Sequence, residues 1–211
     1  MAHPKVCTLE VRKAVMRFVL ALGVLLALGH VYGKPLATAL LPLFRWEIEQ
    51  LDDTYQVLDL TLNQQGADTV VRLEIGLARV LLIGGRVLYP DPRARADVST
   101  LAGHLTQPAI LSLTLILAWP TRKAAIEYPV RALIACGGIA LVIMADVPFV
   151  LWAEVWNIHV AALEPERFSP LLLWKDFLQG GGRFVLGLAV GALAILVGQR
   201  LVAWRESLPR P

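Results

Sequence analysis

Four long apolar stretches are the feature that most constrains this chain. They cover roughly residues 14–33, 98–119, 132–152 and 184–204. Crossing the hydrocarbon core of a bilayer takes about 20 mostly apolar residues, so each stretch is long enough. Only 18% of the residues are charged, against about 25% in soluble domains. We therefore predict an integral membrane protein with a four-helix transmembrane bundle. This composition argues against a disordered chain, a nucleic-acid-binding protein and an ordinary cytosolic enzyme.

The placement of basic residues predicts the orientation. The amino-terminal tail, the connection between the second and third stretches and the carboxy-terminal end together carry ten basic and three acidic residues, and the other side carries ten and fourteen. Short cytoplasmic segments are enriched in Lys and Arg. We expect a multi-pass protein of the bacterial inner membrane with both termini cytoplasmic. The ten basic residues are Lys5, Arg12, Lys13, Arg17, Arg122, Lys123, Arg131, Arg200, Arg205 and Arg210.

The first apolar stretch leaves two interpretations open. A basic start, an apolar run and the small residues Ala37 and Ala39 are typical of a cleavable signal peptide. The run is longer than usual for such a peptide, however, and Lys34 and Pro35 interrupt it before the cleavage motif. We favour an uncleaved anchor, so that residues 1–44 form a cytoplasmic tail and a first membrane helix.

Residues 45–97 are predicted to form a small extracytoplasmic β domain. Apolar and polar residues alternate in two segments, which is the period of a half-buried strand. Turn residues follow each segment, with Gly66 after the first and the pair Gly84-Gly85 in a predicted hairpin, while Pro90 and Pro92 end the sheet. We expect an antiparallel meander of three strands. The apolar positions are Leu58, Leu60 and Leu62 in the first segment and Thr69, Val71, Leu73, Ile75 and Leu77 in the second.

So small a sheet cannot bury its own apolar face. Val71, Leu73, Ile75 and Leu77 are therefore the candidate partner face, to be covered by another membrane or periplasmic protein. Unpaired edge strands also favour strand addition by a second chain. The alternative is that a helix of the same chain closes over this face.

That helix is predicted at 169–180, lying in the outer membrane interface. Ser169 and Pro170 are a typical helix start, and the glycines 180–182 a typical stop. A dozen residues are too few to span the bilayer. The remaining domain, 98–211, thus holds three transmembrane helices and this interfacial helix.

Asp146 is the only acidic residue within a predicted span and the candidate functional polar residue. A charge in the bilayer is costly, which by default points to function. Asp146 lies near the outer end of its stretch, however, and Pro148 follows closely. Two interpretations stay open: a structural role at the interface, or a proton or partner contact.

Other reactive side chains give no positive sign of catalysis. His30, His104 and His159 lack the spacing of metal ligands, and Cys136 has no base or positive charge in its span to form a thiolate. Phosphate-binding and nucleophile-elbow glycine motifs are missing. We expect no catalytic residue, no metal and no cofactor.

The fourth stretch carries small residues along one helical face. Gly187 and Gly191 form a GxxxG motif, and Ala194 and Gly198 extend it. Small residues let helix backbones approach closely. These four are candidate helix-packing residues, either within the bundle or in a dimer.

The order of these parts resembles the exosortase H-associated membrane protein family of Gram-negative bacteria. The likeness rests on the amino-terminal anchor, on FRWEIEQLDDTYQVLDLTL before the β segment, on LTQPAILSLTLILAWP, and on ALIACGGIALVIMADVPFVLWAEVW. It covers most of the chain at the level of layout. The resemblance implies an accessory membrane protein and gives no catalytic residues. The peptidases themselves differ, because the arginine and histidine that follow their cysteine motif are missing here.

These observations favour a non-enzymatic accessory or scaffold protein of the inner membrane, which assists an exosortase-type system for sorting envelope proteins. Its partners would be the bilayer and another protein, and not nucleic acid. The alternative is a small transporter or enzyme subunit that depends on Asp146.

Overall fold

The structure is a computed structural model that describes residues 4–121 and 123–207. Arg122 and Arg210, two of the basic residues that predict the orientation, lie outside the described residues. The elements in chain order are α1 (Pro4–Leu51), β1 (Tyr55–Gln65), β2 (Asp68–Leu77), β3 (Leu81–Ile83), β4 (Arg86–Leu88), β5 (Arg95–Leu101), a short 3-10 helix η1 (Ala102–Leu105), α2 (Gln107–Ala118), α3 (Ala124–Leu163), α4 (Pro170–Phe177), a π-helical turn η2 (Leu178–Gly182) and α5 (Arg183–Ser207).

Three helical segments in the described part of the chain are long and apolar enough to cross a membrane. They are Arg12–Leu51, Ala124–Leu163 and Pro170–Arg205. The prediction of helices long and apolar enough to span a membrane, together with a small antiparallel sheet, is confirmed at this level. The helices extend past the predicted stretches: α1 continues without a break through Ala37 and Ala39, and α3 begins before residue 132 and ends after residue 152.

The second predicted stretch, 98–119, is only partly helical. Its first residues complete β5 and η1, and α2 has 12 residues, a length of about 18 Å at 1.5 Å per residue. This is shorter than the roughly 30 Å of a hydrocarbon core. The physical reason is visible in β5, where Val98 and Thr100 are buried while Asp97 and Ser99 are exposed, which is the alternation of a strand.

The chain divides into two compact units, which are described separately. The helical unit contains the described parts of 1–31, 106–142 and 184–211. The sheet unit contains Tyr32–Leu105 and Ile143–Arg183. Both α1 and α3 contribute to each unit, because their first and second halves belong to different ones.

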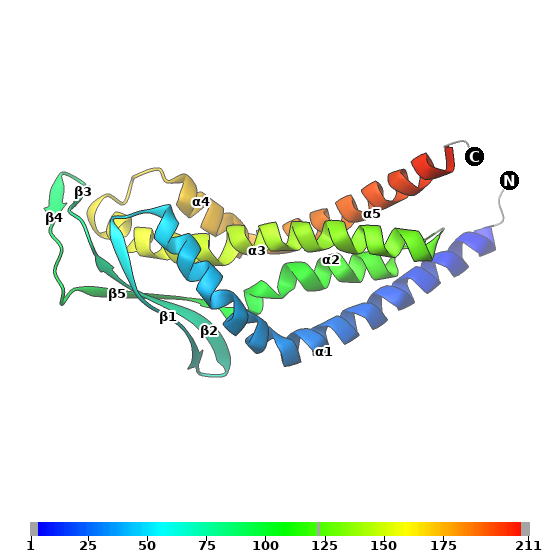
Figure 1. The fold of residues 1–211 in the computed structure, drawn as a ribbon, viewed down its shortest axis with the longest axis horizontal. Coiled ribbons are helices and arrows are strands. Elements are labelled where there is room, and N and C mark those ends of the chain that lie inside the picture. Colours follow the sequence, from blue (N-terminus) through cyan, green and yellow to red (C-terminus); the bar gives the residue numbers. More distant parts are fainter. Residues whose placement is uncertain (1–3, 122, 208–211) are drawn as a thin grey trace. The chain divides into compact units, whose positions relative to one another are not determined.

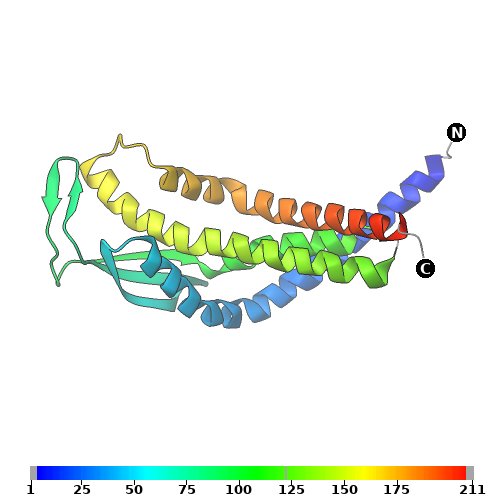
Figure 2. The same ribbon diagram turned by 45° about the horizontal axis from the view of Figure 1, so that its top comes forward.

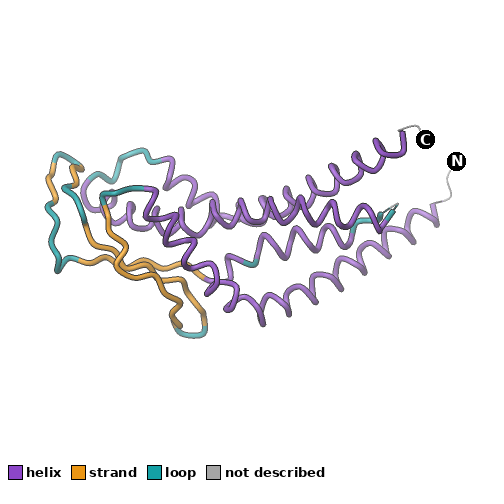
Figure 3. The backbone as a smooth tube through the Cα atoms, viewed as in Figure 1, coloured by secondary structure: helices purple, strands orange, loops and turns teal. Residues whose placement is uncertain are grey.

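The sheet unit has three antiparallel strands in the order β1-β2-β5, and a separate hairpin of β3 and β4 (Figure 3). The hairpin turn at Gly84-Gly85 is present, with both residues at positive φ. The segment 80–89 around Gly84-Gly85, which the meander was expected to use after its second strand, does not join the three-stranded sheet. Residues 95–101 pair with β2, whereas β3 and β4 pair only with each other among the described strands.

A bulge also changes the first strand. The β1–β2 register shifts between Val57 and Asp59, which leaves Leu58 38% exposed while Leu60 is buried. An extra residue in one strand reverses the alternation on either side of it. The prediction that Leu58 shares a face with Leu60 and Leu62 was therefore wrong.

The apolar face of the sheet is covered by two helices of the same chain. Its core combines strand residues with Ala37, Phe44 and Ile48 of α1 and with Val147, Leu151, Trp152 and Val155 of α3. These helical positions recur at three-, four- and seven-residue steps, so each helix presents one apolar stripe. Burying a large apolar side chain contributes about 1.5–3 kcal/mol, so these buried side chains stabilise the sheet against the two helices.

The glycine run after α4 does not stop the helical path as predicted. α4 ends at Phe177, and η2 joins it directly to α5. Gly181 has φ +107°, a backbone conformation that only glycine adopts readily. The glycines therefore form a kink within a connected helical segment, and the predicted interfacial helix 169–180 corresponds to α4 and the start of this kink.

Candidate functional site

Asp146 forms a buried, two-point ion pair with Arg183. The Arg183 Nε atom donates to Asp146 Oδ2 at 2.7 Å, and Nη2 donates to Oδ1 at 2.8 Å. Both side chains are almost fully buried within the sheet unit. Two parallel N–H···O bonds between a guanidinium and a carboxylate are the strong, geometrically specific form of this pair. Both carboxylate oxygens of Asp146 are thus engaged.

The kink in the glycine run positions Arg183. Gly181 turns the chain at its positive φ, and Arg183 follows as the first residue of α5. On the other side, Asp146 lies two residues before Pro148, which lacks the N–H that a helix uses to bond the carbonyl four residues earlier. Trp174 of α4 donates its indole N–H to the carbonyl of Ala145 at 2.7 Å. The ion pair therefore fastens the kink to α3, and the Trp174 hydrogen bond fastens α4 to α3.

Glu154, further along α3, makes further polar contacts with α4 and η2. Its carboxylate accepts from Lys175 Nζ at 3.4 Å and from Gln179 Nε2 at 3.2 Å. Lys175 of α4 and Gln179 of η2 thus face α3, whereas Leu173 and Phe177 of α4 are exposed. Within the sheet unit, α4 is held by these polar contacts to α3 and by Leu171, which packs against the apolar core.

The candidate partner face lies in the core of the sheet unit. Val71 and Leu73 are fully buried and Ile75 is 2% exposed, while Leu77 packs at the edge of the same cluster. α1 and α3 occupy this face. Leu171 of α4, within the helix that we predict at 169–180, packs against the same cluster.

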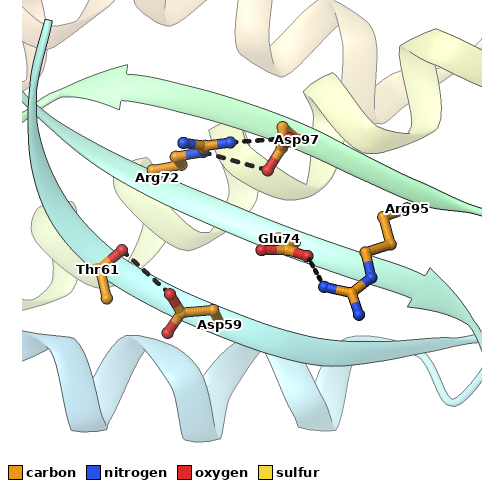
Figure 4. A network of polar contacts seen from close by, with 6 residues as sticks. All are labelled: Asp59, Thr61, Arg72, Glu74, Arg95 and Asp97. Carbon is orange, nitrogen blue, oxygen red and sulfur yellow. Dashed lines mark hydrogen bonds and ion pairs between the residues drawn. The ribbon is translucent and has the colours of Figure 1, made fainter.

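The opposite face of the sheet is polar and exposed (Figure 4). Arg72 bonds Asp97 across β2 and β5, and Arg95 bonds Glu74 at 2.7 Å. The Thr61 hydroxyl points to Asp59 on β1. A depression of about 530 Å³ lies over this sheet, lined by Asn63, Gln64, Gln65, Val70, Arg72, Asp97, Val98 and Ser99. Amide, hydroxyl and paired charged groups thus form the part of the sheet that is open to other molecules.

The four candidate packing residues of α5 lie against other parts of the helical unit. A Cβ on Gly187 would lie 2.9 Å from Pro108 Cα, and one on Gly191 would lie 3.0 Å from the Ser112 carbonyl oxygen. The Ser112 hydroxyl is 2.6 Å from the Gly187 carbonyl oxygen. Ala194 is fully buried, and Gly198 makes room for the Arg131 side chain. The small-residue face of α5 is therefore packed against α2 and α3 of the same chain.

A second buried ion pair was missed from the sequence. Arg131 donates to Glu127 at 2.5 Å and lies within 3.4 Å of the carbonyl oxygens of Trp119 and Pro120. It thereby satisfies carbonyls at the carboxyl end of α2, where a positive charge is favourable. The spacing of an acid four residues before a base was a usable signal. The partner of Asp146 had no such local signal.

The histidines do not converge on one site. His30 lies on α1, His104 in η1 and His159 on α3, and no group of three or more potential metal ligands occurs among the residues that the structure describes. His159 instead contacts Tyr55, whose hydroxyl is 3.2 Å from His159 Nδ1. The Tyr55 ring also meets Trp152 edge to face at 5.0 Å. Cys136 is a free, exposed thiol.

Comparison of the chain with protein-family models, with curated proteins and with solved structures finds no match.

Proposed function

We propose that this chain is a non-enzymatic accessory protein of the bacterial inner membrane, which presents a small folded domain outside the cytoplasm to another protein. In the proposed topology α1, α2, α3 and α5 all cross the membrane and both termini are cytoplasmic. α2 serves as the fourth crossing together with η1, as part of an apolar helical segment, Ala102–Ala118. The layout-level resemblance to exosortase-associated proteins adds the proposed context, which is the sorting of envelope proteins.

The observation that carries this proposal is the bonding of Asp146. A residue that carries protons or binds a substrate needs a free oxygen or a change of partner, and both Asp146 oxygens are held by Arg183. The buried charges Glu127 and Lys175 are likewise paired with neighbours in the fold. Amide, hydroxyl and charged groups that are open to other molecules lie on the outward face of the sheet. This pattern supports binding by a surface over chemistry in a pocket.

The alternative is a transporter or enzyme subunit that depends on the Asp146 carboxylate. A pair of variants separates the two. Asp146→Asn alone leaves Arg183 buried without its counter-charge, whereas Asp146→Asn with Arg183→Gln removes both charges and keeps polar groups in place. Only the second variant tests chemistry apart from stability.

The test compares these variants in a strain that lacks the chromosomal copy, with processing of the sorted envelope proteins as the readout and protein abundance measured in parallel. We expect the double variant to restore processing in proportion to its abundance. Loss of processing at normal abundance in the double variant would contradict the proposal and favour the Asp146-dependent alternative. If deletion leaves processing unchanged, the exosortase context is wrong.

A further inference from the structure

The strand β5 has one edge without a hydrogen-bonding partner. It is an outer strand in the sheet order β1-β2-β5, and it pairs with β2 over its whole length, from Arg95 to Leu101. Among the described residues, the backbone of residues 95–100 bonds to β2 alone. Backbone groups of a strand point alternately to its two sides. The free side of β5 therefore presents a row of N–H and C=O groups that an extended chain can pair with.

β5 lacks the features that protect most edge strands. Those features are prolines, bulges and charged side chains that keep a second strand away. β5 contains no proline, and its register with β2 runs without a shift. Its two charged residues, Arg95 and Asp97, are paired with Glu74 and Arg72 on the neighbouring strand. The free edge is therefore regular, and its charges are balanced within the sheet.

The opposite edge of the sheet, on β1, is protected in two ways. A bulge shifts the register between Val57 and Asp59, and a bulge interrupts the regular row of pairing groups. Arg45 of α1 also donates from Nη2 to the carbonyl oxygen of Val57 at 3.4 Å. The contrast between the two edges favours β5 as the place where a strand can be added.

The polar depression over the sheet reaches the free edge. It is lined by Asp97, Val98 and Ser99, three consecutive residues of β5. Because successive side chains point to opposite faces, a depression that touches all three extends along the strand. A strand added here places alternate side chains beside Asp97 and Ser99, and the others beside the buried Val98 and Thr100. The segment that fits therefore alternates polar residues with small apolar ones.

The direction of α3 excludes a second copy of the chain as the occupant. Two identical antiparallel strands are related by a two-fold axis perpendicular to the sheet, and this axis reverses every direction within the plane of the sheet. Val147, Leu151 and Val155 of α3 pack on the covered face, and Figures 1 and 2 show the yellow half of α3 extending lengthwise beside the sheet. In such a dimer the two α3 helices would run in opposite directions, which one topology in one membrane forbids.

We propose that the free edge of β5 binds an extended segment of a second protein, which adds a fourth strand to the three-stranded sheet. Backbone hydrogen bonds along residues 95–100 supply the affinity, and the alternation of side chains supplies the selectivity. Acyl chains cannot satisfy backbone N–H and C=O groups, so lipid does not complete this edge. The proposal rests on the proposed function, since it names how the outer domain holds its partner.

The test uses the full chain in intact cells, with a photo-crosslinking amino acid at Ser99 or at Leu101. Both positions are exposed and lie two residues apart on the same face of β5. We expect both to crosslink to one segment of one other protein, with the modified residue differing by two positions between the probes, because paired strands advance together. Thr61 on β1 is the matched control, and no adduct with that segment is expected there.

Substitutions separate the edge from the polar face. Ser99→Lys places a long charged side chain on the edge, and it should lower the yield at Leu101 about tenfold. Thr61→Lys adds the same charge on β1 and should preserve the yield. Asn63→Ala with Gln65→Ala removes amides of the depression without changing β5, and this variant should preserve the yield as well. Protein abundance is measured in parallel.

The proposal is overturned by the absence of adducts at both β5 positions, by adducts to lipid or only to another copy of the chain, or by adducts that do not differ by two residues. An equal loss of yield in Ser99→Lys and in the double alanine variant would also contradict it. If Thr61 crosslinks to another protein while the β5 positions do not, the edge assignment fails and the proposed function stands. If no exposed position of the sheet unit crosslinks to another protein, the proposed function fails as well.

Discussion

Asp146 and Arg183 show how a single carboxylate is accommodated in an apolar setting. Breaking a buried ion pair by removing one partner costs about 3–5 kcal/mol, because the other charge stays buried without compensation. Removing both charges costs much less. We expect Asp146→Asn and Arg183→Gln each to lower the free energy of unfolding by that amount, and the double variant to recover most of the loss. Chemical denaturation of the purified protein in lipid discs measures all three against wild type.

Independent, additive losses for the two single substitutions would contradict this prediction, since additivity is the sign of residues that do not interact. A matched control is Arg72→Gln with Asp97→Asn. This pair is half exposed on the outward face of the sheet, where an ion pair contributes about 0–1 kcal/mol.

Tyr55 gives the sheet unit a sensitivity to alkaline pH. Burial raises the pKa of Tyr55 above its ordinary value of 10.0, and the nearby Asp52 adds to the rise. The folded state therefore holds this proton more tightly than the unfolded state. The stabilisation is fully present below pH 10 and is lost as pH rises from there towards the folded-state pKa. We expect the free energy of unfolding to fall above pH 10, and to fall less steeply in Tyr55→Phe. Equal slopes for the two proteins would exclude this origin.

For single residues, the sequence predicted burial and turn conformation better than it predicted which side chains form ion pairs with each other. The burial of Val71, Leu73 and Ile75 follows from alternation, and the positive φ of Gly84 and Gly85 follows from the turn that a glycine pair favours. The partner of Asp146 does not, because Arg183 is distant in the chain and no local spacing connects the two. Long-range pairs of this kind depend on tertiary packing that periodicity does not encode.

Among the elements, α5 needs a residue without a side chain at Gly187, where α2 packs closely. A methyl group on Gly187 would meet backbone atoms of Pro108 at 2.9 and 3.0 Å, and backbone cannot move aside as a flexible side chain does. We expect Gly187→Ala to destabilise the protein by about 1–3 kcal/mol through overpacking. Gly137→Ala is the control, because nothing lies within 4 Å of a Cβ there and alanine favours a helix. Thermal unfolding in lipid discs compares the two, and equal melting temperatures would refute the close approach of α2 and α5.

The element boundaries that the sequence misplaced share a physical cause. Residues 98–101 are apolar enough to extend a membrane stretch, yet their alternation places them in β5. The glycines 180–182 normally end a helix, but here η2 carries the chain through the kink and Arg183 is anchored on Asp146. In both places tertiary contacts decided between two local structures that the sequence alone permits.

For the whole molecule, the proposed topology makes a direct prediction. Alkaline phosphatase is active only outside the cytoplasm, so a fusion at Asn63 should be active and one at Lys123 inactive. Lys123 lies on the side with the excess of basic residues, and Asn63 lies in β1 of the sheet unit. Fusions at equal expression provide the measurement. Activity at Lys123 would reverse the orientation.

The sharing of the sheet's cover between α1 and α3 has a consequence for synthesis. The α1 residues of the core precede the strands in the chain, whereas residues 143–163 of α3 follow them and follow α2 as well. A nascent chain therefore completes β1, β2 and β5 before it has made the second helix that seals Val71 and Leu73. During that interval an apolar surface is open to wrong contacts, which is the condition under which intermediates aggregate. A chain cut short before residue 143 therefore keeps this apolar surface exposed and is the form most in need of chaperones or proteases. Synthesis of the second half of α3 supplies the helix that covers the surface.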